Sequence, residues 1–351
     1  MSRAKMPKQL LPIINGRSLL EIAVSRLEGL VPPDCIYICA GEIHRRAIVE
    51  RLAAIDDQHY LGEPVGRDTI NAVALAAAVI TRQDPDAVIA TFTADHIIEP
   101  VDKFRDIVDT GYAVAENGTR TLVTFGIAPT HAATGYGYLK LGAPIGGQGD
   151  DTARIVDAFR EKPASETATA YLEAGPDHYL WNSGMFVWRA DTLLHCLASY
   201  EPETHQAMQT IGDAWETERQ QSVLAEIYPT LKRTSVDYGI MEPASHDAAI
   251  TVAAVPMPLT WLDVGSWSAF ASTCDEDDRG NALAAARHAV LETQRCLVAS
   301  SDPDHLIAAV GCEDLLIVHT EDATLVCRAD AAEQIKALHA QLGDAFGSQY
   351  L

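Results

Sequence analysis

The sequence predicts an α/β fold that is followed by a small β-rich unit and a closing helix. Over about the first 130 residues, short apolar runs alternate with helical patterns, whereas after residue 280 short apolar runs follow one another closely. Strands that alternate with helices favour a mostly parallel sheet covered on both faces, and closely spaced strands favour a separate β unit. We therefore expect two domains, residues 1–275 and residues 281–351.

Apolar periodicity places the elements of the first domain in order. The early part is expected to contain strands at residues 35–39, 87–92 and 121–127 and helices at residues 42–54, 69–81 and 103–116. The pattern then changes, because two apolar runs flank a Gly/Asp-rich turn at residues 146–151, as paired strands do. The later elements are strands at residues 138–141, 154–159 and 185–188 and helices within residues 193–231, so the expected sheet is mixed but mostly parallel.

Four short strands and a helix form the second domain. The strands are expected within residues 291–300, 306–310, 315–320 and 324–327, and the helix at residues 330–342 with Asp330 as its N-cap. An acidic segment that ends in glycine, residues 275–280, is the expected linker.

Composition and charge exclude several classes of protein. A formal net charge of −23 disfavours nucleic acid, which requires a basic surface, but a local group of Lys, Arg and metal can still hold a phosphate. No apolar run reaches the roughly 18 residues of a membrane span, and the start lacks the pattern of a secretory signal. The seven scattered cysteines predict a reducing, cytoplasmic compartment, with Cys35 and Cys39 as buried free thiols.

Two acidic residues stand where a divalent cation could bind. Asp95 follows an apolar strand, and ligands of open parallel sheets sit at the carboxyl ends of strands. Asp263 lies between bulky apolar residues and precedes Gly265, which lets backbone approach closely. Mg²⁺ is usually held by one or two carboxylates plus substrate phosphates, so the pair would suit it. Each acid taken alone is more often a turn residue or a helix cap.

A lysine and a helix N-terminus could bind phosphate. Lys8 precedes a short apolar run, and Arg3 stands before it. Arg67 lies just ahead of an expected helix N-terminus, which itself attracts anions. By itself, a lysine in such a place is most often a surface residue.

Four further residues are suited to a sugar phosphate. Gly135 stands among aromatic residues, where a flat ligand can approach the backbone. Glu161 and Asn182 can hydrogen-bond sugar hydroxyls, and Lys162 could neutralise the phosphate. A hairpin entry and ordinary strand ends are the structural alternatives for these positions.

Together these segments resemble the mannose-1-phosphate guanylyltransferases in order and approximate spacing, from Arg3 to about Ala329. The motifs that carry the resemblance are Pro-Lys-Gln at 7–9, Thr-Phe-Gly-Ile at 124–127, Thr-Gly-Tyr-Gly-Tyr at 134–138, Glu-Lys-Pro at 161–163, Trp-Asn-Ser-Gly-Met-Phe at 181–186, Ser-Val-Asp-Tyr-Gly-Ile-Met-Glu at 235–242 and Asp-Val-Gly-Ser-Trp at 263–267. The resemblance implies a Rossmann-like nucleotidyltransferase domain and a small C-terminal domain like a left-handed β-helix.

The resemblance also implies a reaction and roles for the residues. Mannose 1-phosphate would attack the α-phosphorus of GTP, giving GDP-mannose and pyrophosphate, with Mg²⁺ as the cofactor. The implied metal ligands are Asp95 and Asp263, and Lys8 would contact phosphate. The expected substrate-binding residues are Arg3, Arg67, Gly135, Glu161, Lys162 and Asn182. No partner other than the substrates is implied, and a homodimer stays open.

Two departures from the family leave alternatives. The family's loop Gly-Gly-x-Gly-Thr-Arg would overlap and precede Arg3 and is absent from the chain as written, through a mis-assigned start or a truncated paralogue. Such loops bind phosphate through backbone N–H groups, so we expect weaker GTP binding than in a version extended by about 15–25 residues. Residue 68 is Asp where the family commonly has Asn, which leaves the base preference open. The alternatives are another hexose-1-phosphate nucleotidyltransferase and a non-catalytic regulator that binds sugar nucleotide.

Overall fold

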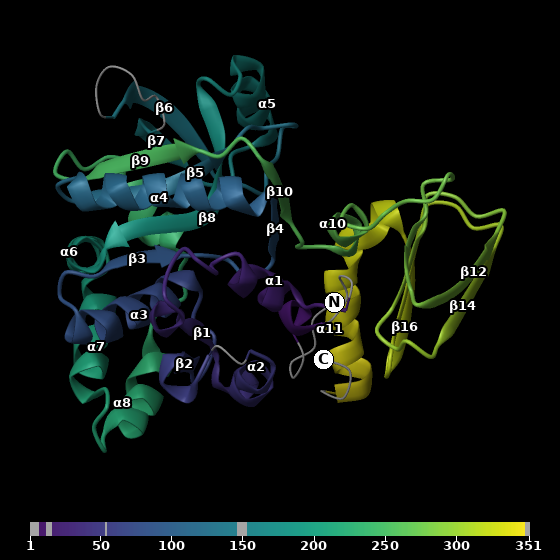
Figure 1. Cartoon of the computed structure of the whole chain (residues 1–351), viewed down its shortest axis with the longest axis horizontal. Helices are drawn as coiled ribbons and strands as arrows, with labels where there is room; N and C mark the ends of the chain where they lie inside the picture. The colour runs from purple at the N-terminus through teal and green to yellow at the C-terminus, as the bar shows by residue number, and fades with distance from the viewer. Residues whose placement is uncertain (1–6, 12–15, 53–54, 146–152, 348–351) are drawn as a thin grey trace. The chain divides into compact units, whose positions relative to one another are not determined.

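Two compact units make up the computed structural model, which describes residues 7–11, 16–52, 55–145 and 153–347 (Figure 1). The β-helix unit comprises Met1–Arg26, Ala94–Ile98 and Thr260–Leu351. The sheet unit comprises Leu27–Thr93 and Glu99–Leu259. Each unit is therefore assembled from segments that are distant in sequence. The division into residues 1–275 and residues 281–351 stays a prediction.

A six-stranded mixed sheet forms the centre of the sheet unit. Its strand order is β3 (Val88–Thr91), β8 (Tyr179–Arg189), β5 (Thr121–Ile127), β9 (Thr251–Pro256), β7 (Arg154–Arg160) and β6 (Tyr138–Pro144). β5 and β9 pair in parallel, whereas β8 pairs antiparallel with both β3 and β5. β7 pairs antiparallel with β9 and with β6, so β3, β5, β9 and β6 run in one direction and β7 and β8 in the other. The predicted mixed sheet is confirmed, and β8 lies between β3 and β5 in it.

Helices cover both faces of this sheet. On one face, α3 (Thr69–Gln83), α6 (Ala190–Tyr200) and α7 (Pro202–Ala214) share a buried core with Leu122 and Trp188. On the other face, α4 (Val101–Asn117) lies against β5 and β8 (Figure 1). Gly111 allows this approach, because a Cβ at that position would lie 2.8 Å from Cζ of Phe125. The expectation of a sheet covered on both faces is met.

The remaining elements of the sheet unit surround this core. A separate parallel pair is formed by β1 (Ile38–Gly41) and β2 (Tyr60–Glu63). The further α-helices are α2 (Arg45–Arg51), α5 (Ser165–Ala174), α8 (Gln220–Ile227) and α9 (Glu242–Ala244). Short 3-10 helices lie at Pro33–Cys35, Glu42–His44, Asp57–His59 and Tyr228–Thr230, and a π-helix lies at Asp237–Met241.

The β-helix unit combines short strands with three α-helices among its described residues. In chain order its elements are the 3-10 helix Lys8–Leu10, α1 (Leu19–Ser25), β4 (His96–Glu99), β10 (Thr260–Asp263), α10 (Trp267–Ala271), β11 (Ala282–Ala284), β12 (Arg287–Leu291), β13 (Leu297–Ser300), β14 (Leu306–Val310), β15 (Leu315–Thr320), β16 (Ala323–Arg328), the 3-10 helix Ala329–Gln334 and α11 (Ile335–Phe346). β4 pairs with β10, and β11, β13, β15 and β16 form one small sheet.

Parallel pairing between successive turns of chain gives this unit its β-helical character. Leu297 pairs with Leu316, and Arg287 pairs with Leu306, so equivalent positions of these turns are 19 residues apart. The corners repeat at the same spacing, since Arg295 and Asp314 both adopt positive φ and form an ion pair. Stacking of this kind buries a continuous apolar interior that no single turn could bury alone.

Three local expectations were wrong. The first strand begins at Ile38 rather than residue 35, because Pro33 starts a 3-10 turn, and Cys35 is exposed. The helix expected at residues 42–54 is a 3-10 turn followed by α2, which ends at Arg51. Asp330 is not an N-cap, because it lies inside a 3-10 helix and α11 begins at Ile335. The turn expected at residues 146–151 lies outside the described residues.

Two other findings concern the cysteines and the length of the helices. All seven cysteines are free thiols, but of the pair expected to be buried, Cys35 is exposed and Cys39 is only partly buried. Within the described ranges, no helix has both the length and the apolar character needed to cross a membrane.

Candidate active site

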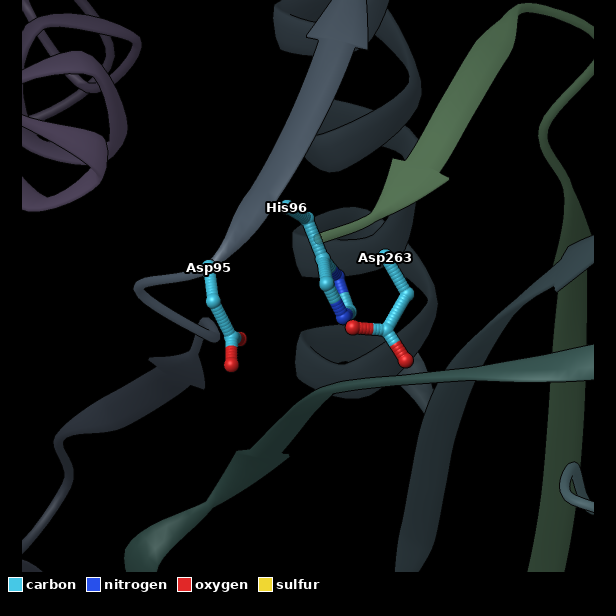
Figure 2. Close-up of side chains that lie close together, drawn as sticks. All are labelled: Asp95, His96 and Asp263. Carbon is cyan, nitrogen blue, oxygen red and sulfur yellow. The ribbon is translucent and has the colours of Figure 1, made fainter. Parts of the chain in front are cut away.

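Asp95, His96 and Asp263 bring their polar side chains together in the β-helix unit (Figure 2). β4 begins at His96 and pairs with β10, which ends at Asp263, so strand pairing fixes where these residues lie. One ligand atom from each of the three lies within 4.8 Å of the others. The backbone N–H of Val264 donates to the carbonyl oxygen of Asp95 at 3.0 Å, which holds the two acid-bearing segments together.

Lys8 lies beside these acids. Its Nζ is 2.9 Å from Oδ2 of Asp95 and donates to the carbonyl oxygen of Val264 at 2.8 Å. Nε2 of Gln9 donates to the same Oδ2 at 3.3 Å. The ammonium group therefore contacts both acid-bearing segments and offsets part of their charge.

Repulsion between the two carboxylates makes the site receptive to a cation. Burial raises the pKa of the Asp263 carboxyl, and the charge of Asp95 raises it further, while Lys8 opposes the shift. Carboxylate oxygens are the hard donors that Mg²⁺ and Mn²⁺ prefer. Gly265 keeps the space beside the carboxylate open, since a Cβ there would lie 3.3 Å from Oδ1 of Asp263. The residues present thus fit a hard divalent cation.

Arg26 and Trp261 hold His96 in place. The side chain of Arg26 is buried, and its Nη1 donates to the carbonyl oxygen of His96 at 2.8 Å. Burial lowers the pKa of Arg26 to about 10, so the guanidinium stays charged at neutral pH. Nε1 of Trp261 donates to Nδ1 of His96 at 3.1 Å, and the two rings meet edge to face. Burial lowers the pKa of His96 to about 4, against the opposing effect of Asp95.

A second group of polar residues lies in the sheet unit, where a hydrogen-bonded chain links β5, β8 and the π-helix. Oγ1 of Thr124 donates to Oδ1 of Asn182 at 2.6 Å, and Nδ2 of Asn182 donates to Oδ1 of Asp237 at 2.8 Å. Because a carboxylate only accepts, these contacts fix the orientation of the Asn182 amide and leave one N–H for a further acceptor. π-Helices occur frequently at functional sites.

Glu161 and Lys162 form an ion pair beside this chain. Nζ of Lys162 is 2.8 Å from Oε1 of Glu161 and 5.9 Å from the centre of the Tyr238 ring. Gly137 makes room for the acid, because a Cβ there would lie 2.6 Å from Oε2 of Glu161. Burial raises the pKa of Asp237 to about 6, with a further increase from Glu161 and a partial reversal by Lys162.

Comparison with known families assigns most of the chain to two family descriptions. Residues 3–280 match the nucleotidyl transferase family, and residues 286–342 match the MannoseP isomerase/GMP-like β-helix domain. The first match covers well over half of the chain. The chain belongs to the nucleotidyl transferase family. The expected architecture, an α/β nucleotidyltransferase domain with a mixed sheet, a C-terminal β-helix-like domain and a terminal helix, is confirmed.

Individual proteins are similar to this one over nearly the whole chain. Mannose-1-phosphate guanylyltransferase from Klebsiella pneumoniae is 37% identical over 342 residues, which is 96% of this chain and 69% of that protein. Xanthan biosynthesis protein XanB from Xanthomonas campestris is 35% identical over 355 residues, 99% of this chain and 71% of that protein. The crystal structure of a mannose-1-phosphate geranyltransferase from Thermus thermophilus matches with a TM-score of 0.83 at 28% identity, covering 97% of this chain and 94% of that one.

The site residues expected of a nucleotidyl transferase fall into two groups, one in each unit. The groups are Lys8, Asp95 and Asp263 in the β-helix unit and Glu161, Lys162 and Asn182 in the sheet unit. Each group contains both acidic and basic or amide side chains, so each can bind an anionic, hydroxyl-bearing ligand. The role of each residue in binding or catalysis stays a prediction.

The other three expected residues lie apart from these contacts. Gly135 is exposed, and a Cβ there would meet no atom within 4 Å. Arg67 donates to the carbonyl oxygen of Pro229, and its own carbonyl accepts from Asn71 at 2.6 Å. Arg3 lies outside the described residues. Their contact with substrate also stays a prediction.

Four residues of these groups are not apparent as site residues from the sequence. Thr124 and Asp237 stand inside two of the motifs, at 124–127 and 235–242, so a search of every motif position could have found them. The place of His96 depends on Trp261, which is 165 residues away. Arg26 gives no local signal, because its burial depends on a contact 70 residues away.

Proposed function

We propose that this chain transfers GMP from GTP to mannose 1-phosphate and releases pyrophosphate. The observation that carries the proposal is the pair of carboxylates, Asp95 and Asp263, beside Lys8 in a nucleotidyl transferase. In the reaction a phosphate oxygen of mannose 1-phosphate forms a bond to the α-phosphorus of GTP. The bond from that phosphorus to the oxygen bridging to the β-phosphorus breaks, and the electron pair leaves with pyrophosphate. Atoms and charge balance without an added reactant.

Asp95 and Asp263 would hold Mg²⁺, which would offset the charge of the phosphates when bound. The contacts of Asp95 with Lys8 and Gln9 both use Oδ2, which leaves Oδ1 for the cation. Lys8 holds a fixed positive charge at the same place and is the residue we propose to contact phosphate.

The group in the sheet unit would serve the sugar phosphate. Glu161 can accept hydrogen bonds from hydroxyls, and Asn182 has one N–H to donate. Lys162 is exposed, and its backbone adopts a positive φ of 43°. Few residues other than Gly adopt this conformation, so the direction of the Lys162 side chain is set by an unusual backbone geometry. We propose that its ammonium binds the sugar phosphate.

No protein nucleophile is needed for this reaction. Both reactants are anions, so the task of the protein is to hold them in line and to offset their charge. We also propose a cytoplasmic location, because seven free thiols fit a reducing compartment.

The test is release of pyrophosphate by the purified chain with GTP, mannose 1-phosphate and Mg²⁺. Asp95→Asn and Asp263→Asn should each lower kcat by at least about a hundredfold, because each removes a negative ligand from the cation. The matched control is Asp304→Asn, an exposed acid of the same unit whose ion pair with Arg287 lies outside the group. Circular dichroism checks that each variant keeps its fold.

Panels of nucleoside triphosphates and hexose 1-phosphates decide the finer assignment. Fastest turnover with another base or sugar would replace the proposed substrates while leaving the reaction class intact. Turnover close to wild type in either acid variant would remove the proposed metal ligands.

A further inference from the structure

The direction of the Asn182 amide is decided by Asp237 rather than by Thr124. A threonine hydroxyl can donate or accept, and Oγ1 of Thr124 lies 2.6 Å from Oδ1 of Asn182 and 3.1 Å from the carbonyl oxygen of Met185. If the amide were turned over, this hydroxyl could accept from Nδ2 and donate to Met185 instead. An ionised carboxylate has no such choice, so Oδ1 of Asp237, 2.8 Å away, must face the amide nitrogen.

The backbone that carries Asn182 is held on two sides. Its N–H donates to the carbonyl oxygen of Gly137 at 2.8 Å, and the residue pairs with Gly126 of β5. The pairing of β8 with β5 is irregular between Asn182 and Phe186, and such bulges re-aim side chains next to active sites. With the backbone held, the freedom left to the amide is a half-turn that exchanges Oδ1 and Nδ2, and Asp237 removes it.

Asp237 carries its charge above neutral pH. Burial is the main cause that raises the pKa of its carboxyl to about 6, with Glu161 adding to the rise and with Ser235 and Lys162 opposing it. In an assay above neutral pH the group therefore only accepts hydrogen bonds.

The amide held in this way presents one N–H that neither Thr124 nor Asp237 uses. Glu161 lies next to it, because a Cβ at Gly137 would be 2.6 Å from Oε2 of Glu161 and 3.4 Å from Cβ of Asn182. One neighbour therefore donates and the other accepts. A hydroxyl satisfies both at once, since its oxygen accepts from the N–H and its proton goes to the carboxylate. A fluorine or an ether lacks the proton, and a protonated amine lacks the lone pair.

We infer that Asp237 is a positioning residue of the sugar site, which holds the Asn182 amide so that Asn182 and Glu161 together select one free hydroxyl of the sugar phosphate. The inference rests on the sugar-binding group proposed above. The role of Asp237 passes through Asn182 and not through contact with the sugar.

Asp237→Asn is the decisive variant. The new side chain has the same shape, but an amide can donate as well as accept, so Asn182 can take either direction against it. The matched control is Asp86→Asn, an exposed acid of the same unit that pairs with Arg189.

The kinetic test compares mannose 1-phosphate with its monodeoxy forms, with GTP as the second substrate and above neutral pH. In the wild type, one deoxy form should lose at least about tenfold in kcat/KM, because the hydroxyl that both neighbours bind is missing. Asp237→Asn should raise KM for mannose 1-phosphate by about tenfold, leave KM for GTP unchanged and shrink the loss for that deoxy form. Asp86→Asn should change none of these values.

A double-mutant cycle decides whether Asp237 acts through Asn182. In an Asn182→Ala background, Asp237→Asn should cause little further rise in KM, because the amide that it would release is gone. Additive effects, an equal rise in KM for GTP, or an unchanged loss for every deoxy form would overturn the inference.

Nuclear magnetic resonance of the Asn182 side chain tests the direction of the amide without turnover. Its NH₂ pair, identified by its loss in Asn182→Ala, should contain one proton shifted downfield by the bond to the carboxylate. The shift should diminish in Asp237→Asn and stay as it is in Asp86→Asn. A wild-type NH₂ pair without a downfield proton would overturn the inference, even if Asp237→Asn does not fold. If the wild type turns over no sugar phosphate, the proposed function fails, while the NH₂ pair still decides whether Asp237 holds the amide.

Discussion

Asp237 shows how a single residue depends on its surroundings. Its carboxylate accepts a hydrogen bond from Asn182, lies near the charge of Glu161 and sits at the start of a π-helix. Burial is the largest cause that raises its pKa from 3.8 to about 6, and the charge of Glu161 is the next. At neutral pH the group is ionised in an environment that disfavours the charge, which lowers the stability of the folded state.

This gives a stability prediction with a definite sign. The folded protein binds the Asp237 proton more tightly than the unfolded chain, so the contribution is fully present below pH 3.8 and is lost as the pH rises through about 6. The loss amounts to about 2–3 kcal/mol. Asp237→Asn should remove this component, so its free energy of unfolding relative to wild type should rise between pH 4 and pH 7. Urea unfolding at several pH values measures it, and a constant difference across that range would contradict the shifted pKa.

At the residue scale, the sequence reveals acids and bases that stand in recognisable motifs. Asp95 and Asp263 could be predicted as partners because each stands in such a motif, Asp95 after an apolar strand and Asp263 shortly before Gly265. The contacts of Asp237 with Asn182 and of His96 with Trp261 join residues 55 and 165 positions apart. A sequence does not show which residues so far apart along the chain come into contact, so these two contacts could be found only from the fold.

Among the elements, the loop that leads into β6 illustrates a close approach that only glycine permits. A Cβ at residue 137 would lie 2.6 Å from Oε2 of Glu161 and 3.4 Å from Cβ of Asn182. The carboxylate is the end of a flexible side chain, so it would move aside at small cost in stability. Gly137 therefore sets where Glu161 points rather than whether the sheet folds.

Gly137→Ala should raise KM for mannose 1-phosphate by about tenfold, equivalent to about 1.4 kcal/mol, because a hydrogen bond of that size is lost when Glu161 moves. If the effect passes through Glu161, the double variant with Glu161→Gln should be no worse than the more damaging single variant. Gly135→Ala is the matched control, since its new methyl group would meet no atom within 4 Å. It should combine additively with Glu161→Gln. If the effects of Gly137→Ala and Glu161→Gln on KM add instead, Gly137→Ala does not act through Glu161.

The entry to the β-helix depends on one buried amide. Asn281 is fully buried, and its Nδ2 donates to Asp277 Oδ2 and to the carbonyl oxygen of Thr293, while its Oδ1 accepts from the N–H of Cys296. These bonds join the first turn of the β-helix to the second. Removing the side chain leaves buried backbone groups without partners.

Asn281→Ala should therefore lower the free energy of unfolding by about 2–5 kcal/mol in chemical denaturation. Arg287→Gln, which breaks the exposed ion pair with Asp304 in the same unit, should cause a much smaller loss. Equal losses in the two variants would mean that the amide has no special role.

Element positions were predictable where a periodic pattern is long, as in α3 and β5, whose observed bounds agree with expectation. The partner of each strand was not, because β8 is buried on both faces and its apolar run gives no sign that it inserts between β3 and β5. The 19-residue spacing is not apparent in the sequence, since stacking requires only similar apolar character at each turn and not repeated residues.

For the molecule as a whole, the β-helix unit joins three separate stretches of chain in one core. Leu19, Val264, Trp267 and Phe270 pack in the same cluster as residues of β13 and β15. Val264 directly follows Asp263, so the position of a proposed metal ligand depends on strands that come later in the chain. Dividing the chain near residues 275–281 would separate residues of this core, although the two family matches meet close to that point.

Residues 1–275 expressed alone should consequently aggregate or bind hydrophobic dyes, because Val264, Trp267 and Phe270 lose the apolar residues that cover them. The fragment should also lose Mn²⁺ affinity relative to the full chain. Near-ultraviolet circular dichroism, sedimentation and Mn²⁺ titration of the two proteins measure this. A monomeric fragment with unchanged Mn²⁺ affinity would support independent domains as predicted from the sequence.

Stacked positions such as Leu297 and Leu316 are 19 residues apart, and this spacing limits which insertions the region can accept. An insertion of one residue in a strand turns every inward side chain after it outward, because strands alternate at a period of two. A duplicated stretch of a whole turn keeps every later side chain in its row and adds a layer instead. Evolution and engineering should therefore lengthen the β-helix in complete turns, because only a complete turn keeps the later strands in register with the rows of apolar residues already stacked.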